Sequence, residues 1–171
     1  MTVGDDLPLA APRPILVRRA WLPAAVVMAG SLVTILPAVA PAPLLPPFGL
    51  LLLLAWRLRR PDLVQPWAPA LLGAFDDLVS GQPMGSAVLL WTVCTLSVDV
   101  LDSRLVSRDF RQDWLIAAGG ASFCLAAGRL VASRLSAHVD SALLLQMVAA
   151  ALLYPAIARL VVRLDAWRER P

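Results

Sequence analysis

Two adjacent carboxylates, Asp76 and Asp77, stand within the run GAFDDLVSGQPMG, residues 73–85, of an otherwise apolar stretch. Paired acids can act as general acid and base, or hold a proton or cation, when both face one site. On a helix, however, neighbouring side chains point about 100° apart. Asp77 shares its face with Gly73, four residues earlier, and Asp76 points elsewhere. The run therefore does not predict a catalytic carboxylate pair.

A spacing of four residues links Asp77 to three glycines, Gly73, Gly81 and Gly85. If one helix continues through them, this edge allows another helix to approach closely. If Pro83 instead ends the helix, the later glycines form a tight turn whose free backbone groups Asp77 caps. A proton or cation site in a transporter is the third alternative. No second acid suits a relay within a membrane centre, which favours a structural or partner-contact role for Asp77.

The other reactive side chains form no catalytic or metal-binding set. His138 is the only histidine and lies in a connection between apolar runs. Cys94 and Cys124 lie inside apolar runs, as is typical of small buried hydrophobic residues. A metal site needs a cluster of such ligands, and a nucleophilic serine needs a nearby base. We therefore predict a protein that is not an enzyme and that has no cofactor and no metal ion.

The elements that hold these side chains are apolar helices. Of the 171 residues, 59% are hydrophobic and 16% are charged, whereas soluble domains carry about 25% charged residues. We therefore predict an all-α integral membrane protein, since about 20 apolar residues cross the roughly 30 Å hydrocarbon core. A cytoplasmic N-terminal segment, 1–20, precedes a membrane domain, 21–164, and a cytoplasmic basic tail, 165–171. Six transmembrane helices are predicted, at roughly 21–40, 44–58, 64–80, 84–101, 114–132 and 142–164.

The placement of arginine predicts the orientation of these spans. All 15 basic residues are arginine, and all but Arg129 and Arg134 fall on one side of the six predicted spans. The excess of positive charge marks the cytoplasmic side, so both termini are expected there. These arginines also suit anionic lipid headgroups. No arginine-rich run is interleaved with stacking aromatics, so we predict no nucleic-acid partner.

The central run resembles the signature of the MreD family of bacterial rod shape-determining membrane proteins. The segment PPFGLLLLLAWRLRRPD is similar to the family's proline-led second span, and LLYPAIARLVVRLDAWRER is similar to its final span. Asp76 departs from the family pattern, in which an apolar residue is expected at this position. The resemblance therefore implies a role for Asp77 and no special role for Asp76. The residues that match the signature one by one are Gly73, Asp77, Leu78, Ser80, Gly81 and Gly85.

The resemblance implies a non-enzymatic scaffold subunit of the rod complex (elongasome) in the bacterial inner membrane, required for rod shape and lateral peptidoglycan synthesis. Its implied partners are MreC, RodA with its transpeptidase partner, and, through the complex, MreB. The implied fold is similar to the S component of energy-coupling-factor transporters. An S component of a vitamin transporter, or another small-solute transporter, is therefore the alternative function. The candidate partner-contact or structural residues are Gly73, Asp77, Gly81, Gly85, Tyr154 and Pro155.

Overall fold

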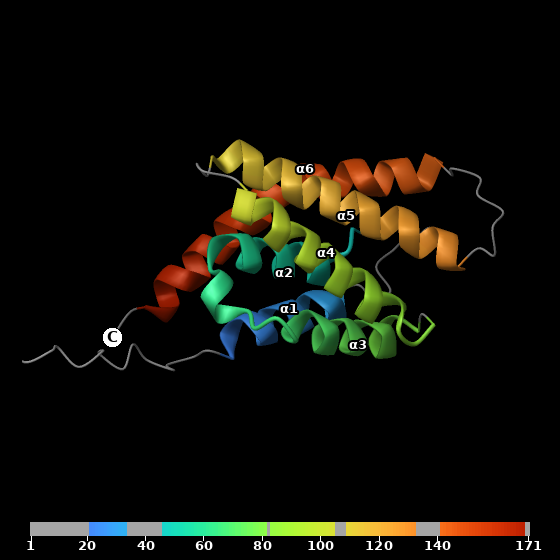
Figure 1. Cartoon of the computed structure of the whole chain (residues 1–171), viewed down its shortest axis with the longest axis horizontal. Helices are drawn as coiled ribbons and strands as arrows, with labels where there is room; N and C mark the ends of the chain where they lie inside the picture. Colours follow the sequence, from blue (N-terminus) through green and yellow to red (C-terminus); the bar gives the residue numbers. More distant parts are fainter. Residues whose placement is uncertain (1–20, 34–45, 82, 105–108, 133–140, 170–171) are drawn as a thin grey trace, which may run out of the picture.

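The computed structural model describes residues 21–33, 46–81, 83–104, 109–132 and 141–169 (Figure 1). Within these ranges all regular structure is helical, and each predicted apolar segment overlaps one α-helix, so the all-α prediction is confirmed. A short 3-10 helix, η1, follows the second α-helix. The elements in chain order are α1 (Leu22–Val33), α2 (Phe48–Arg59), η1 (Pro61–Leu63), α3 (Ala68–Ser80), α4 (Ser86–Arg104), α5 (Phe110–Ala132) and α6 (Ser141–Arg168).

Local sequence signals explain where α3 begins and ends. Pro69 lies in its first turn, where the missing N–H of proline costs no helical hydrogen bond. The helix ends at a left-handed C-cap, Gly81, whose φ of 67° is unfavourable for other residues. Since α3 stops at Ser80, Gly81 and Gly85 do not continue one helix edge from Asp77. Of the two backbone alternatives, a continuous helix edge and a turn, the turn is the one that forms.

The last two helices extend beyond their apolar segments. α5 begins at Phe110, four residues before the segment 114–132, and α6 continues past residue 164 through Arg168. Hydropathy marks only the apolar part of a helix, whereas arginine, glutamine and alanine also have high helix propensity. The charged ends of these helices therefore remain helical outside the apolar part.

Length and apolarity together separate α4 and α6 from the other helices. The windows Ser86–Ser103 in α4 and Leu143–Arg168 in α6 are long and apolar enough to cross a membrane. α1 and α2 have 12 residues each and α3 has 13. A 12-residue helix is about 18 Å long, less than the roughly 30 Å hydrocarbon core. Two of the six predicted spans thus have the required length and apolarity within the described residues.

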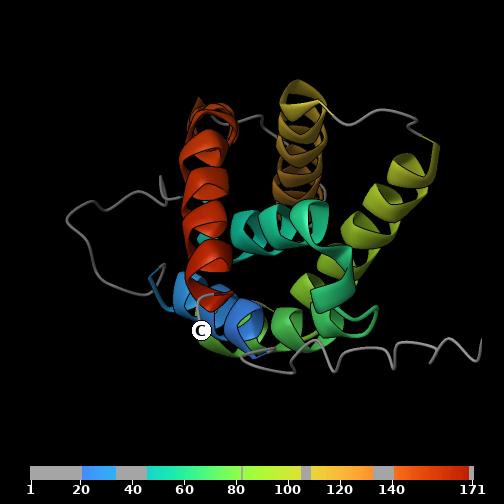
Figure 2. The same ribbon diagram turned by 90° about the vertical axis from the view of Figure 1, so that its left-hand side faces the viewer.

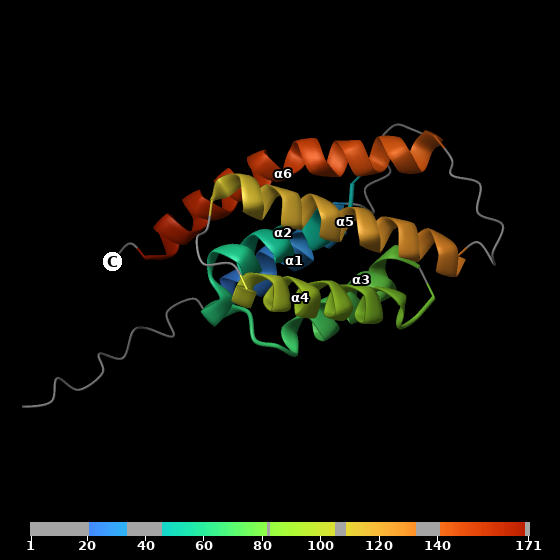
Figure 3. The ribbon, with the colours of Figure 1, turned by 45° about the horizontal axis from the view of Figure 1, so that its top comes forward.

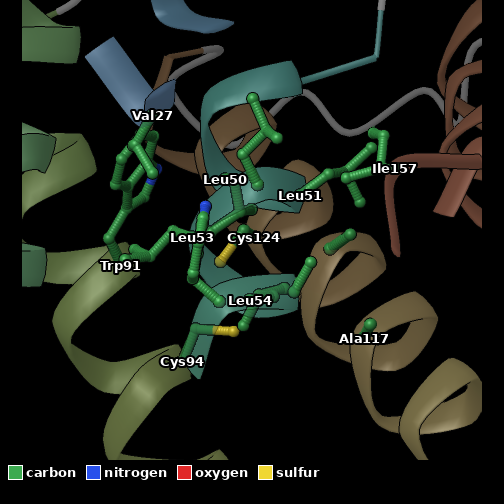
Figure 4. Packing of buried hydrophobic residues seen from close by; sticks show 14 of the residues in the cluster. Val27, Leu50, Leu51, Leu53, Leu54, Trp91, Cys94, Ala117, Cys124 and Ile157 are labelled. Atoms are coloured by element: carbon green, nitrogen blue, oxygen red, sulfur yellow. The ribbon is translucent and has the colours of Figure 1, made fainter. Parts of the chain in front are cut away.

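α2 lies at the centre of the bundle, with α1, α4, α5 and α6 packed around it (Figure 2). Nine of its residues are buried. An apolar run on every side of a helix suits an element that is enclosed all round, which accounts for the run of five leucines. Around them lie Trp91 and Cys94 of α4, Ala117 and Cys124 of α5, and Ile157 of α6 (Figure 4).

α3 and α4 follow each other through a short turn and pack against each other as a hairpin (Figure 3). Their contact is the most extensive between any two helices of the described chain. The hairpin carries the run 73–85, so the acids and glycines of that run lie where two helices meet.

Candidate functional site

The carboxylate of Asp77 lies at the N-terminal end of α4, and the residue is 2% exposed. Its Oδ1 accepts hydrogen bonds from the Ser86 hydroxyl and the Ala87 N–H, each at 2.9 Å. Its Oδ2 accepts from the Gly85 N–H at 2.8 Å and the Val88 N–H at 3.4 Å. The first N–H groups of a helix have no partner within it, and the positive end of the helix dipole favours an anion. Asp77 thus caps α4 from the neighbouring helix.

The glycines of the run have two different structural roles. A Cβ on Gly73 would lie 2.8 Å from backbone atoms of Ala87 and Val88, so only glycine permits this approach of α3 to α4. Gly85, in contrast, has no atom within 4 Å of such a Cβ, but its φ of 99° disfavours any other residue. Gly81 has the same kind of backbone requirement. Close approach and turn shape together bring the first N–H groups of α4 to Asp77. We call Gly73, Asp77, Gly81 and Gly85 the aspartate end.

Asp76 lies beside Asp77 in sequence but in a different environment. Ser31 of α1 lies beside its carboxylate. Asp76 also lines a cavity of about 270 Å³, together with Arg129 and Gln146. Among the described residues, no arginine forms an ion pair with Asp76. The two carboxylates therefore have different surroundings: Asp77 is bonded to the start of α4, and Asp76 lies beside α1 and a cavity.

The C-terminal end of α2 is joined to α4 by an ion pair. Arg57 binds Asp99 in a bidentate manner, with Nε–Oδ1 at 2.8 Å and Nη2–Oδ2 at 2.7 Å. Its remaining nitrogen, Nη1, donates to the carbonyl of Pro61 at 3.2 Å and to the carbonyl of Val64. Planar, two-point pairing of this kind is among the stronger hydrogen-bonded contacts. One arginine thus fastens α2, the turn after it and α4.

The same end of α2 is joined to α6 through Asp165, whose side chain is 3% exposed. Asp165 lies 2.9 Å from Arg60, 3.2 Å from Arg168 and 3.7 Å from Arg59. Arg60 also pairs with Glu169. The hydrogen bond and the charge of Asp165 raise the pKa of the Arg60 guanidinium above its ordinary value.

We call Arg57, Arg59, Arg60, Asp99 and Asp165 the arginine end. The arginine pattern alone indicates only orientation, and it does not single out Asp165. Its position among arginines on the last helix, three residues before Arg168, is the signal that could have identified it.

Tyr154 and Pro155 lie in α6, which packs mainly against α5 and α2 rather than against α3, the helix of Gly73 and Asp77. Tyr154 is 2% exposed and belongs to the hydrophobic core. α6 bends partway along its length (Figure 3), as expected for a helix with an internal proline. The structure therefore does not bring all six candidate residues together.

The missing N–H of Pro155 deprives the carbonyl of Ala151, four residues earlier, of its helical donor. Trp114 of α5 donates its indole N–H to that carbonyl at 2.7 Å. A neighbouring helix thereby restores the hydrogen bond that the proline removes. The sequence does not single out Trp114, because the tryptophan and the proline are far apart in the chain.

The described residues contain no group of three or more histidine, cysteine or acidic side chains that could hold a metal ion. Cys94 and Cys124 are buried and not joined in a disulfide. Both oxygens of Asp77 are occupied by donors from the start of α4. The arrangement around Asp77 thus holds two helices in a set geometry.

A family model, that of the rod shape-determining protein MreD, matches residues 19–164. The matched region contains the aspartate end and most of the arginine end, including Arg57, Arg60 and Asp99. No curated protein and no solved structure matches the chain.

Proposed function

Because the chain belongs to the MreD family of rod shape-determining membrane proteins, we propose that it is a non-enzymatic scaffold subunit of the rod complex. In this role it supports lateral peptidoglycan synthesis beside MreC, RodA with its transpeptidase partner, and, through the complex, MreB. The family match over residues 19–164 carries the proposal. The all-helical fold and the two helices long enough to cross a membrane support it.

The proposed arrangement in the inner membrane has six spans with both termini in the cytoplasm. Residues 1–20 form the cytoplasmic N-terminal segment, 21–164 the membrane domain and 165–171 the basic tail. In this orientation the arginine end faces the cytoplasm, in agreement with the positive-inside rule. We propose that the bundle has the fold of the S component of an energy-coupling-factor transporter. The segment 1–20 lies outside the described residues.

As a scaffold, the α3–α4 hairpin acts as a rigid platform. Asp77 is buried and bonded within the hairpin, so it acts on partners through the position of the two helices. The contacts themselves fall to exposed apolar side chains such as Leu71, Leu78 and Leu89, which are 61%, 64% and 62% exposed. In a membrane, such side chains meet either lipid or the span of another protein.

A pull-down of the tagged full-length protein from its native membrane in mild detergent tests this proposal. We expect MreC-like and RodA-like proteins among the partners identified by mass spectrometry. Asp77→Asn should weaken their recovery and impair rescue of rod shape in a deletion strain. Asp62→Asn, the matched acid-to-amide change in η1, should leave both unchanged. Normal recovery and rescue with Asp77→Asn would remove Asp77 from the proposal.

The alternative function is an S component of a vitamin transporter or another small-solute transporter. The cavity that Asp76, Arg129 and Gln146 line favours this alternative, because binding sites for small molecules combine a hollow with a few polar groups. Its volume of about 270 Å³ lies just below the usual range for ligand pockets. Recovery of ATPase subunits with a coupling membrane protein in the pull-down would support the transporter and contradict the scaffold.

A further inference from the structure

A second cavity, of about 460 Å³, lies at the arginine end between α2, α5 and α6. We propose that this cavity binds the phosphate headgroup of an anionic phospholipid, and that an acyl chain of the lipid lies against the apolar wall of the cavity. This inference rests on the membrane location of the chain and is independent of which proteins it binds. The lining residues that carry the argument are Arg59, Asp113, Arg159, Leu58, Phe110 and Val162.

The charge of the lining favours an anion. Arg159 is exposed and forms no ion pair with any residue that the structure describes. Arg59 approaches only Asp165, at 3.7 Å, and that carboxylate already has closer partners in two other arginines. The lining also contains one acid, Asp113, so its formal charge is positive. Guanidinium groups bind phosphate oxygens with paired, charge-assisted hydrogen bonds.

The apolar part of the cavity favours a lipid over free phosphate. Leu58 is buried, while Phe110 and Val162 are 56% and 39% exposed, so the apolar wall reaches the surface of the bundle. A free phosphate ion gains nothing from such a wall, whereas an acyl chain packs against it. Basic hollows between membrane helices at the cytoplasmic side are places where anionic headgroups bind.

Lipid binding to the full-length protein in mild detergent tests the proposal, with phosphatidylglycerol as the probe and phosphatidylcholine as the uncharged comparison. Native mass spectrometry at increasing lipid concentration gives the apparent affinity. We expect Arg159→Gln to weaken phosphatidylglycerol binding about tenfold, since it removes a charge-assisted contact. Arg163→Gln removes the same charge one turn later on α6, outside the cavity lining, and should change the affinity less than about twofold.

A second variant separates the cavity from its charge. Ala158→Phe places a large side chain in the lining without changing any charge, and it should weaken binding while thermal unfolding shows that the protein remains folded. Equal losses in Arg159→Gln and Arg163→Gln would mean diffuse attraction to positive charge and would overturn the proposal. Equal binding of phosphatidylcholine, or displacement of the lipid by millimolar inorganic phosphate, would also overturn it. None of these outcomes bears on recovery of the rod-complex partners.

Discussion

The two ends of the bundle each bury a carboxylate between helices, but they neutralise it with different donors. At the aspartate end, Asp77 accepts three backbone N–H groups and one hydroxyl from the start of α4. At the arginine end, Asp165 is surrounded by long side chains, and those of Arg59 and Arg60 are 45% and 39% exposed. The first carboxylate is held by donors that the helix itself positions, and the second by donors that must be ordered one by one.

This difference affects how much each end contributes to stability and how each end responds to substitution and to salt. Backbone donors lose no side-chain freedom when they bind, and a buried pair is screened little by salt. The partly exposed Arg59 and Arg60 lose side-chain entropy when they pair with Asp165 and are screened by salt, so each of these ion pairs contributes little. We therefore expect the aspartate end to be stiff and intolerant of change. The arginine end should tolerate single changes and respond to ionic strength.

The largest effect is expected at Asp77. Asp77→Ala leaves the N–H groups of Gly85, Ala87 and Val88 without their acceptor, and we expect a loss of about 3 kcal/mol in the free energy of unfolding. Asp77→Asn keeps one acceptor oxygen and should lose about half as much. Denaturant unfolding in detergent measures both. A loss at Asp77→Ala no greater than that at exposed Asp62→Ala would contradict the comparison.

The next effect is expected at Gly73. A Cβ there lies 2.8 Å from the backbone of α4, which must move away from Asp77, so Gly73→Ala should cost about 2 kcal/mol. Gly119→Ala is the matched control, because no atom lies within 4 Å of its Cβ. That change should be neutral or slightly stabilising, since alanine favours a helix. Thermal unfolding of the two variants measures this difference. Equal unfolding temperatures for Gly73→Ala and Gly119→Ala would show that α4 has room to shift and would contradict the prediction.

A smaller effect, with a different salt dependence, is expected at Asp165. Asp165→Asn removes the acid shared by Arg59, Arg60 and Arg168, and should cost about 1.5 kcal/mol at low salt. At roughly 0.5 M salt, where the Debye length is only a few ångströms, the loss of unfolding free energy for Asp165→Asn should shrink. The loss for Asp77→Asn should not change. Glu169→Gln, at a more exposed acid, is the control and should have almost no effect. The same salt response at both aspartates would remove the distinction between the two ends.

The smallest effect is expected between the ends, at Trp114. Trp114→Phe keeps the aromatic ring but removes the donor to the Ala151 carbonyl, and should cost about 1 kcal/mol. Trp21→Phe, at a residue that is 64% exposed, provides the comparison. Restoring an N–H with Pro155→Ala should make Trp114→Phe nearly neutral in a double-mutant cycle. Additive losses would mean that the indole does not compensate for the proline.

Much of the fold follows from local pattern. Apolar runs of helical length, separated by prolines, charges and glycines, predict the number and order of the helices. Because adjacent side chains on a helix point in different directions, Asp76 and Asp77 are predicted to have different surroundings, and in the structure they do. The apolar pattern does not predict the start of α5 or the end of α6, because helix propensity continues where apolar character stops.

The pairing of distant residues does not follow from local pattern. Arg57 and Asp99 are 42 residues apart, and Arg60 and Asp165 are 105 residues apart. A positive charge near a span predicts the side of the membrane equally well whether or not an acid meets it. The choice of Asp165 as the acid at the end of α2 depends on how α6 crosses the bundle, which no single segment encodes.

The sequence by itself determined a helical, membrane-type chain and an acid among glycines at its centre, because composition, periodicity and turn-forming residues act over short distances. Only the tertiary structure decided what each charge meets. Asp77 reaches the start of α4 because Gly73 lets the two helices touch, and Trp114 reaches the carbonyl freed by Pro155 because α5 lies beside α6. Hydrogen bonds and ion pairs act over a few ångströms, so their partners are set by the packing of whole helices.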